Sequence, residues 1–346
     1  MGSYKNCTLC PRRCGVNRES GGRGYCGETS ALRLGFAGVH HGEEPPVRGA
    51  GGSGTIFVCG CNLGCVFCQN YQVSQGKKIF EKSRISCEIS RIVDTDEFAE
   101  ICLNLQENGA ENINIVTGSH AAPSLARGME AARKQGLVIP ALWNSSGYDG
   151  EETLEILKDF VDVYLPDLKT LDPSIAARFF NAEDYPKHAA QAILKMMELQ
   201  PPRFGPGRGN SRTSGVMLSG VMIRHLIIPG FLENTRQVLR WYAENCGGRA
   251  LLSLMTQYTP VRIPGVNTGI PNRFVSQKEY EAVLSLLDEF AIHDGFCQEL
   301  VTGANWLPDF SQANPFPSKL SVPVWHALTP AGKQNQPQQA HYRGQG

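Results

Sequence analysis

Six short apolar segments, each followed by a turn and usually by a stretch of helical periodicity, constrain the fold of this chain more than any other feature. The segments span residues 55–60, 112–118, 138–144, 161–169, 221–230 and 250–260. The helical stretches span residues 95–109, 121–135, 150–160, 186–199, 232–246 and 276–291. Strands as apolar as "VDVYL" and "VMIRHLII" are normally covered on both faces. Six repeated βα units predict a parallel sheet, either open and doubly wound or curved into a partial barrel.

Charge and hydropathy exclude several classes of partner. The 346 residues include 33 Lys and Arg against 33 Asp and Glu, so the formal net charge is zero. Without a basic run, the chain has no electrostatic footprint for nucleic acid or for an anionic membrane surface. No segment reaches the roughly 18 apolar residues of a membrane span, and the first residues lack the apolar core of a signal peptide. We therefore expect a cytoplasmic protein with no nucleic-acid partner and no membrane partner.

Composition divides the chain into three parts. Residues 1–50 carry four Cys but only short apolar runs, which predicts a Cys-rich N-terminal extension that needs a metal or the main domain to fold against. Residues 51–300 hold the six βα units. Residues 301–346 form a C-terminal segment that we expect to be largely disordered after about residue 315, where the sequence is of low complexity. Within the main domain, the Pro- and Gly-rich residues 201–215 are expected to be either disordered or a substrate lid.

The loop "GTIFVCGCNLGCVFCQN" carries three cysteines directly after the first strand. Cys61, Cys65 and Cys68 have the spacing C-x3-C-x2-C, so their thiolates can converge on one centre. A structural zinc site requires a fourth ligand, whereas three thiolates leave one iron of a 4Fe–4S cluster open for another ligand. The loop also follows a strand at its carboxyl end, where barrels and doubly wound sheets keep their active sites. We interpret the loop as a catalytic cluster site, with a structural zinc site or buried thiols as the alternative.

With Phe67 before the third cysteine, the loop resembles the radical S-adenosylmethionine (radical SAM) superfamily, whose signature is C-x3-C-x-aromatic-C. The segments "LPDLK", "IRHLIIPG" and "QYTP" extend the resemblance, over about residues 5–310, to a branch of uncharacterised proteins named for pyruvate formate-lyase activating enzymes. The resemblance implies an α/β fold with a partial (β/α)6 TIM-like barrel. It also implies that Cys61, Cys65 and Cys68 hold a 4Fe–4S cluster whose open iron binds S-adenosyl-L-methionine (SAM).

The same resemblance implies a reductive mechanism. An external one-electron donor reduces the cluster, SAM is cleaved to methionine and a 5′-deoxyadenosyl radical, and the radical abstracts hydrogen from the substrate. Phe67 then packs near the adenine of SAM. In such an enzyme the cofactors carry the reaction, while the protein supplies orientation, electron entry and exclusion of water.

Residues after the second and fourth strands are candidates for the rest of the SAM site. The family usually carries a Gly-Gly-Glu-like segment after the second strand, where this chain has Thr117 and Gly118 followed by Ser-His. Recognition of the SAM amino group must then come from Thr117, from backbone carbonyls or from a nearby side chain. Asp167 and Lys169 in "PDLK" lie two residues apart on one side of the strand, where a Lys can pair with the SAM carboxylate. A simple ion pair at the strand end is the alternative.

Further candidates lie in the other strands and ahead of the cluster loop. Asn144 ends the third strand and Arg224 lies in the fifth, and polar groups in apolar barrel strands favour site residues. Glu43 and Glu44 precede the cluster strand, so they either line a substrate opening or form a solvated turn. Lone histidines such as His120 are expected to be structural.

Four further cysteines precede the first strand with the spacing C-x2-C-x3-C-x11-C. They are Cys7, Cys10, Cys14 and Cys26. Bunched cysteines in a reducing compartment indicate metal ligands rather than disulfides, and four thiolates complete either a tetrahedral zinc site or a closed 4Fe–4S cluster. The spacing leaves both metals open. An iron–sulfur cluster indicates an electron relay, whereas zinc indicates a structural staple.

Three functions follow from these observations. The leading one is a radical SAM enzyme, an oxidoreductase that activates a glycyl radical enzyme and therefore has a protein substrate. The second is a radical SAM enzyme that acts on a small molecule or a peptide. The third is a metal-stapled binding protein without turnover, which predicts no SAM binding.

Overall fold

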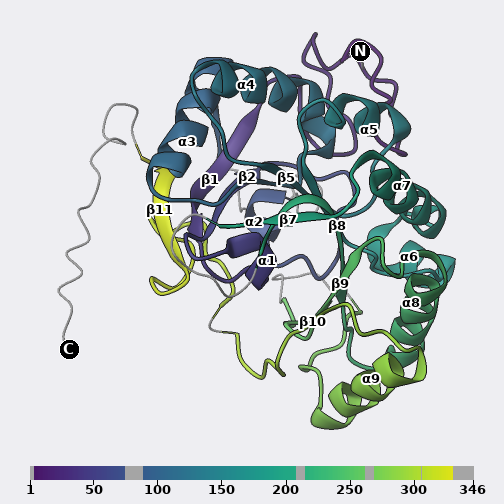
Figure 1. Ribbon diagram of the computed structural model, residues 1–346. Helices are drawn as coiled ribbons and strands as arrows, with labels where there is room; N and C mark the ends of the chain where they lie inside the picture. The colour runs from purple at the N-terminus through teal and green to yellow at the C-terminus, as the bar shows by residue number, and fades with distance from the viewer. Residues whose placement is uncertain (1–3, 75–88, 208–214, 262–268, 305, 330–346) are drawn as a thin grey trace, which may run out of the picture.

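The structure is a computed structural model that describes residues 4–74, 89–207, 215–261, 269–304 and 306–329. In these ranges an eleven-stranded sheet lies at the centre of the molecule, and helices cover its outer side (Figure 1). The sheet is largely parallel, which agrees with the mixed α/β fold expected from the alternating pattern of apolar segments.

All six predicted strands are present and pair in parallel with their neighbours. They are β2 (Ser53–Val58), β4 (Ile113–Val116), β5 (Ala141–Ser145), β6 (Val163–Pro166), β8 (Val216–Leu226) and β9 (Leu251–Met255). They lie side by side in the order in which the chain makes them. A doubly wound sheet reverses its strand order at a switch point. Here the order is not reversed, because each parallel strand lies beside the previous one on the same side. The structure therefore agrees with the partial barrel rather than with the doubly wound sheet.

The six predicted helices are also present. They are α3 (Thr95–Glu107), α4 (Ala122–Lys134), α5 (Glu151–Leu157), α7 (Tyr185–Leu199), α8 (Leu232–Asn245) and α9 (Gln277–Glu289). In Figure 1 helices α4, α5, α7, α8 and α9 follow an arc outside the strands. The sequence reading did not include α6 (Pro173–Phe180), which begins at the N-cap Asp172 with a proline in its first turn and ends at Asn181 in the left-handed conformation. The shorter elements are α1 (Pro45–Arg48), α2 (Tyr71–Ser74) and the 3-10 helix η1 (Ser119–Ala121).

Five strands beyond the six predicted ones extend the sheet, and two of them, β1 and β11, come from the segments near the two ends of the chain. The additional strands are β1 (Arg33–His40), β3 (Arg91–Ile92), β7 (Arg203–Gly205), β10 (Gly295–Cys297) and β11 (Ser321–His326). β1 pairs antiparallel with β2 and with β11. Residues 33–40, which the sequence placed in the N-terminal extension, therefore form part of the central sheet. Disorder after about residue 315 is wrong for residues 316–329, and residues 330–346 lie outside the described residues.

The loop expected over residues 201–215 is in part a strand, because β7 pairs antiparallel with β8. Residues 208–214, on which the lid alternative depends, lie outside the described residues.

An aromatic cluster attaches the C-terminal segment to the antiparallel edge of the sheet. The rings of Phe57 and Phe310 lie 5.0 Å apart, and Phe316 contacts both of them and Phe36. Phe36, Phe57 and Phe310 are all buried. Burial of large aromatic side chains is the dominant stabilising term in such contacts. Order in this segment thus comes from contacts between residues more than 250 positions apart, which the local composition of residues 301–329 does not reveal.

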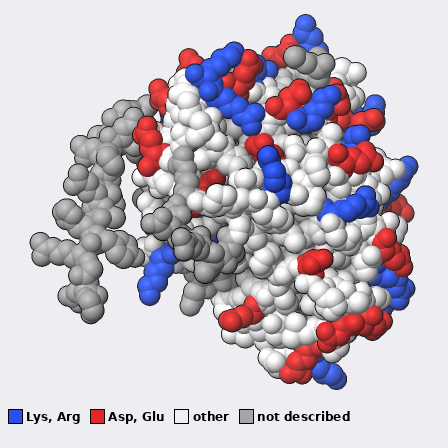
Figure 2. All heavy atoms as spheres, viewed as in Figure 1, with Lys and Arg blue, Asp and Glu red and all other residues white. Residues whose placement is uncertain are grey.

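The surface agrees with the neutral composition. On the face shown in Figure 2, positive and negative side chains are interspersed rather than gathered by sign. Within the described ranges, none of the helices has the length and apolar character that crossing a bilayer requires.

Candidate active site

The three-cysteine loop leaves β2 at its carboxyl end and turns sharply twice. Gly60 and Gly64 have φ values of 83° and 73°, in the left-handed region that favours glycine. At Gly60 a Cβ would also lie 2.5 Å from Glu28 Cγ, so a larger residue has no room. These turns direct Cys61, Cys65 and Cys68 into one cavity.

That cavity has a volume of about 720 Å³ and collects residues from the carboxyl ends of the parallel strands. The predicted site residues that line it are Cys61, Cys65, Phe67, Cys68, Thr117, Asn144, Asp167, Lys169 and Arg224. In a single-direction barrel all strands end on the same side, which is why residues up to 163 positions apart meet there.

Lys169 and Asp167 form a partly buried ion pair in the cavity, with Lys169 Nζ 2.5 Å from Asp167 Oδ2. Burial would lower the pKa of Lys169, but the carboxylate of Asp167, together with the nearby Cys65 and Tyr185, raises it above its ordinary value. The lysine is therefore a fixed cation. Its main chain is fixed as well, because its N–H donates to the hydroxyl of Tyr185 at 3.0 Å. Tyr185 is a positioning residue that the sequence reading did not include.

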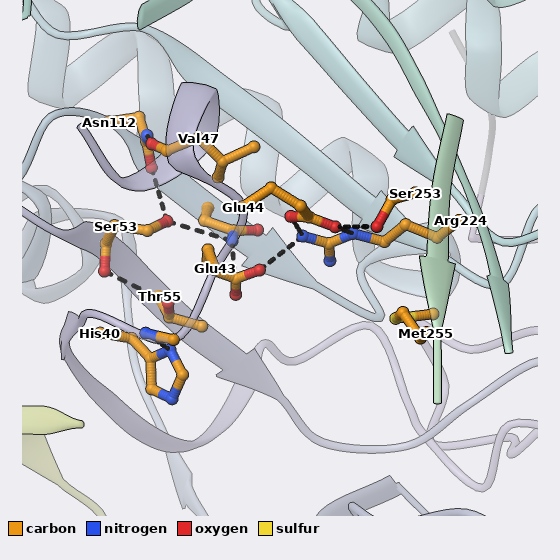
Figure 3. A network of polar contacts seen from close by, with 12 residues as sticks. His40, Glu43, Glu44, Val47, Ser53, Thr55, Asn112, Arg224, Ser253 and Met255 are labelled. Carbon is orange, nitrogen blue, oxygen red and sulfur yellow. Dashed lines mark hydrogen bonds and ion pairs between the residues drawn. The ribbon is translucent and has the colours of Figure 1, made fainter. Parts of the chain in front are cut away.

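Arg224 is held by two carboxylates rather than free in the cavity (Figure 3). Its guanidinium forms a fork with Glu44, with Nε 2.9 Å from Oε1, and also donates to Glu43 Oε2 at 2.5 Å. The hydroxyl of Ser253 donates to Glu44 Oε1 at 2.6 Å. Burial would raise the pKa of Glu44, but Arg224 lowers it below its ordinary value. The solvated-turn alternative for Glu43 and Glu44 is therefore wrong.

The segment after β4 holds an unusual backbone conformation. Thr117 has φ of 64°, which is rare for a β-branched residue and marks a strained position. Its N–H donates to the carbonyl of Asn144 at 2.9 Å, so the two predicted site residues are directly joined. Gly118 lies against the ring of Trp143, where a Cβ would come within 2.6 Å of the indole. Packing is thus the structural reason for glycine at 118.

Phe67 and two histidines have clear structural partners. Phe67 packs against Phe179 and Phe180 and also lines the cavity. His120 is buried, with Nε2 2.7 Å from the carbonyl of Cys59, and burial lowers its pKa to about 3. His225 is buried against Leu168 and Thr235, and burial lowers its pKa to about 4. Both histidines are structural, as expected.

The donor set of the loop fits an iron–sulfur cluster, which thiolates bind. The N–H of Leu63 lies 3.3 Å from Cys61 Sγ, and Cys68 Sγ shares a 3.1 Å hydrogen bond with Ser74 Oγ. Burial raises the pKa of all three thiols, that of Cys68 to about 11, and a cationic centre is what lowers such values. In the described parts of the chain, the side chains of His, Cys, Asp and Glu do not converge in groups of three or more on a position that a single metal ion could occupy.

Sequence reasoning missed the pairing of Glu43 and Glu44 with Arg224, which joins residues about 180 positions apart. A signal was present, because an arginine inside an apolar strand requires a buried anion. The acidic pair just before the cluster strand was the available partner.

Comparisons with known proteins agree with the motif. The family model of the radical SAM superfamily matches residues 55–205. The uncharacterised protein MJ0674 of Methanocaldococcus jannaschii is 31% identical over 289 residues, which cover 83% of this chain and 75% of that protein.

Three solved structures are also similar. SuiB of Streptococcus suis, bound to S-adenosylmethionine, is 14% identical with a TM-score of 0.45. The match covers 69% of this chain and 48% of SuiB, so this chain spans about half the length of SuiB. A radical SAM methyltransferase of Sphaerobacter thermophilus is 14% identical with a TM-score of 0.45, over 71% and 66% of the two chains. A domain of a pyruvate-formate lyase-activating enzyme of Bacteroides vulgatus is 12% identical with a TM-score of 0.35, over 51% and 91%.

Proposed function

The chain belongs to the radical SAM superfamily, and from that membership we propose that it cleaves SAM reductively at a 4Fe–4S cluster held by Cys61, Cys65 and Cys68. The observation that carries this proposal is the shared cavity, in which the three thiols lie with polar residues from four later strand ends. When bound, the cluster and SAM supply a 5′-deoxyadenosyl radical, with one electron from an external donor.

The residues of the chain then have distinct tasks. Lys169, fixed as a cation by Asp167, binds the carboxylate of SAM. Thr117 and Asn144, joined at 2.9 Å, offer a carbonyl and side-chain oxygens to the SAM amino group in place of the carboxylate that the family usually provides. Phe67 closes one wall of the cavity beside the adenine. Together these residues orient SAM and exclude water.

For the substrate we propose the glycine of a glycyl radical enzyme, the class implied by resemblance to the activating enzymes. Hydrogen abstraction there converts SAM and one electron to methionine and 5′-deoxyadenosine and leaves the radical on the partner protein. Mixing the reduced enzyme and SAM with such a partner should give a glycyl radical signal in electron paramagnetic resonance (EPR) spectra.

A small molecule or peptide with a cationic group is the second candidate, and the acidic end of the cavity favours it. Two carboxylates, Glu43 and Glu44, share one guanidinium there, so one negative charge is left in a buried setting. An ammonium or guanidinium group on the substrate would balance that charge. Glu43→Gln should then raise KM for such a substrate while leaving SAM cleavage without substrate unchanged.

The decisive experiment is anaerobic. The chain is reconstituted with iron and sulfide, SAM and a strong reductant are added, and 5′-deoxyadenosine is quantified. We expect product from the wild type, none from Cys65→Ala, and a wild-type amount from Cys102→Ala, a buried thiol in α3 that serves as the matched control. An intact wild-type cluster without product, with or without candidate substrates, contradicts the proposal and favours the binding protein without turnover.

A further inference from the structure

Residues 4–32 form neither helix nor strand and pack beside the cluster loop. The segment carries four thiols, here called the N-terminal thiols, none of which forms a disulfide. They are Cys7, Cys10, Cys14 and Cys26. All except Cys14 are buried. The three cysteines of the cluster loop are here called the loop thiols.

Each N-terminal thiol has a donor aimed at its sulfur. Cys14 accepts the N–H of Tyr25 at 3.2 Å, and Cys7 lies 3.8 Å from a nitrogen of Arg18. The thiols of Cys10 and Cys26 hydrogen-bond to the main chain two residues further on. Donors from the following residues stabilise thiolates, the form in which sulfur binds metals.

Main-chain hydrogen bonds place Cys7 beside the turn that carries Cys14. The N–H of Cys7 donates to the carbonyl of Val16 at 3.1 Å, and the carbonyl of Cys7 accepts the N–H of Gly15 at 3.0 Å. At Gly24 a Cβ would lie 3.2 Å from Cys14 Sγ, so the chain runs close against the thiols. Four free thiols in one short segment, three of them buried, are the donor set that a thiophilic metal centre takes.

A buried arginine supplies positive charge beside the N-terminal thiols. Four thiolates around a dipositive zinc ion or cluster core leave a net charge of about −2. Arg18 is 1% exposed, and its nitrogens donate to the carbonyls of Glu28, Thr29 and His120, which are neutral acceptors. Arg12 lies between Cys10 and Cys14 in the sequence. The charge of Arg18, with a nitrogen 3.8 Å from Cys7 Sγ, complements an anionic centre.

Arg12 also joins this segment to the cluster loop. Its guanidinium donates to the carbonyl of Asn62 at 3.0 Å and to that of Leu63 at 3.3 Å, inside the loop between Cys61 and Cys65. It donates to Phe180 and Asn181 at the end of α6 as well. The ring of Tyr25 covers the guanidinium at 3.7 Å. One side chain thus connects the N-terminal thiols, the cluster loop and α6.

We propose that the N-terminal thiols bind one thiophilic metal centre, zinc or a closed iron–sulfur cluster, that holds the cluster loop in position through Arg12. Arg12 is a positioning residue in this arrangement. The proposal goes beyond SAM cleavage, because metal at the N-terminal thiols does not depend on catalysis.

The first test measures metal in a chain whose loop thiols are disabled by Cys61→Ala and Cys65→Ala. By elemental analysis of anaerobically prepared protein we expect about one zinc or about four irons per chain, and X-ray absorption should show four sulfur neighbours. Adding Cys14→Ser should remove that metal, whereas adding Cys102→Ala should not. A folded loop variant that carries neither metal, or that keeps its metal after Cys14→Ser, overturns the proposal. If Cys14→Ser does not fold, the sulfur coordination of the loop variant decides.

The second test separates positioning from binding. Arg12→Gln should keep the N-terminal metal, shift the EPR spectrum of the reduced loop cluster, and slow 5′-deoxyadenosine formation roughly 100-fold, the scale expected for a misplaced reacting group. Arg12→Lys should recover part of the rate, and Arg13→Gln, a change at the exposed neighbour, should match the wild type. An unchanged spectrum in Arg12→Gln overturns the positioning role. Because metal content and EPR spectra need no turnover, failure here differs from failure of SAM cleavage.

Discussion

The two groups of thiols differ in what supports them. The loop thiols follow β2 and face a cavity whose walls are the ends of buried strands. The N-terminal thiols lie in a segment without helix or strand, whose own apolar cluster consists of Tyr4, Cys7 and Leu9. A scaffold built by the sheet can present an open centre. A segment with so small an apolar core needs a metal centre that all four thiols coordinate in order to stay folded.

The largest expected effect tests that contrast through stability. Cys14→Ser should lower the free energy of unfolding by about 5 kcal/mol, because loss of the proposed metal removes the main support of residues 4–32. Cys65→Ser should cost about 1 kcal/mol, since the sheet already supports its loop. Urea unfolding with limited proteolysis measures both. Equal losses in the two variants would break the contrast.

His120 contacts Cys59, just before the cluster loop, and Arg18 of the N-terminal segment, and its pH dependence sharpens the contrast. Its pKa is about 3 in the fold against 6.5 ordinarily, first because of burial and then because of Arg18. The unfolded chain therefore binds the extra proton, and stability is complete above pH 6.5 and falls as the pH decreases toward 3. Between pH 7 and 4 this histidine should account for a loss of about 3 kcal/mol.

Urea unfolding at both pH values measures that loss. His120→Asn should remove most of this contribution, and His225→Asn should remove a smaller part, because the pKa of His225 falls only to about 4. The same acid loss in the wild type and in His120→Asn would contradict the assignment.

Tyr185→Phe tests the cavity side. The hydroxyl accepts the N–H of Lys169 at 3.0 Å and lies 2.9 Å from the carbonyl of Asp167, so its removal leaves buried main-chain groups without a partner. We expect a loss of about 2 kcal/mol and weaker SAM binding. Tyr164→Phe is the matched control, because the buried hydroxyl of Tyr164 has no hydrogen-bond partner in the described ranges. Equal effects in the two variants would argue against the role of Tyr185.

The smallest effect is expected away from both thiol groups. Ser276 and Glu279 form a capping box at the start of α9. Ser276→Ala should cost about 1 kcal/mol in urea unfolding and leave metal content and SAM cleavage unchanged. If Ser276→Ala changed the metal content or SAM cleavage, a loss of stability alone would be enough to change these two readouts. The effects of the cysteine and tyrosine variants could then not be assigned to their sites.

The predicted strands and helices are present because each depends on local periodicity. β6 is apolar throughout and β8 is apolar over most of its length, which favours buried strands. α6 was missed because it is short and is followed closely by α7. β1 and β11 were missed because neither is stable alone, and their pairing spans almost the whole chain.

The candidate site shows the same division. The loop thiols fall within eight residues, so spacing alone predicts their convergence. Glu44 and Arg224, or Arg12 and Leu63, meet only through the fold. From the sequence one can predict that a buried charged side chain needs a partner, but not which residue that partner is.

By itself, the sequence determined the βα repeat, the three-thiolate loop and the four further thiols, because each is set by neighbours along the chain. The tertiary structure decided that the strands follow one direction around a partial barrel, that two carboxylates neutralise Arg224, and that Arg12 joins the two thiol groups. These depend on burial, since removing water leaves each buried charge and carbonyl to be satisfied by whatever group the fold brings beside it.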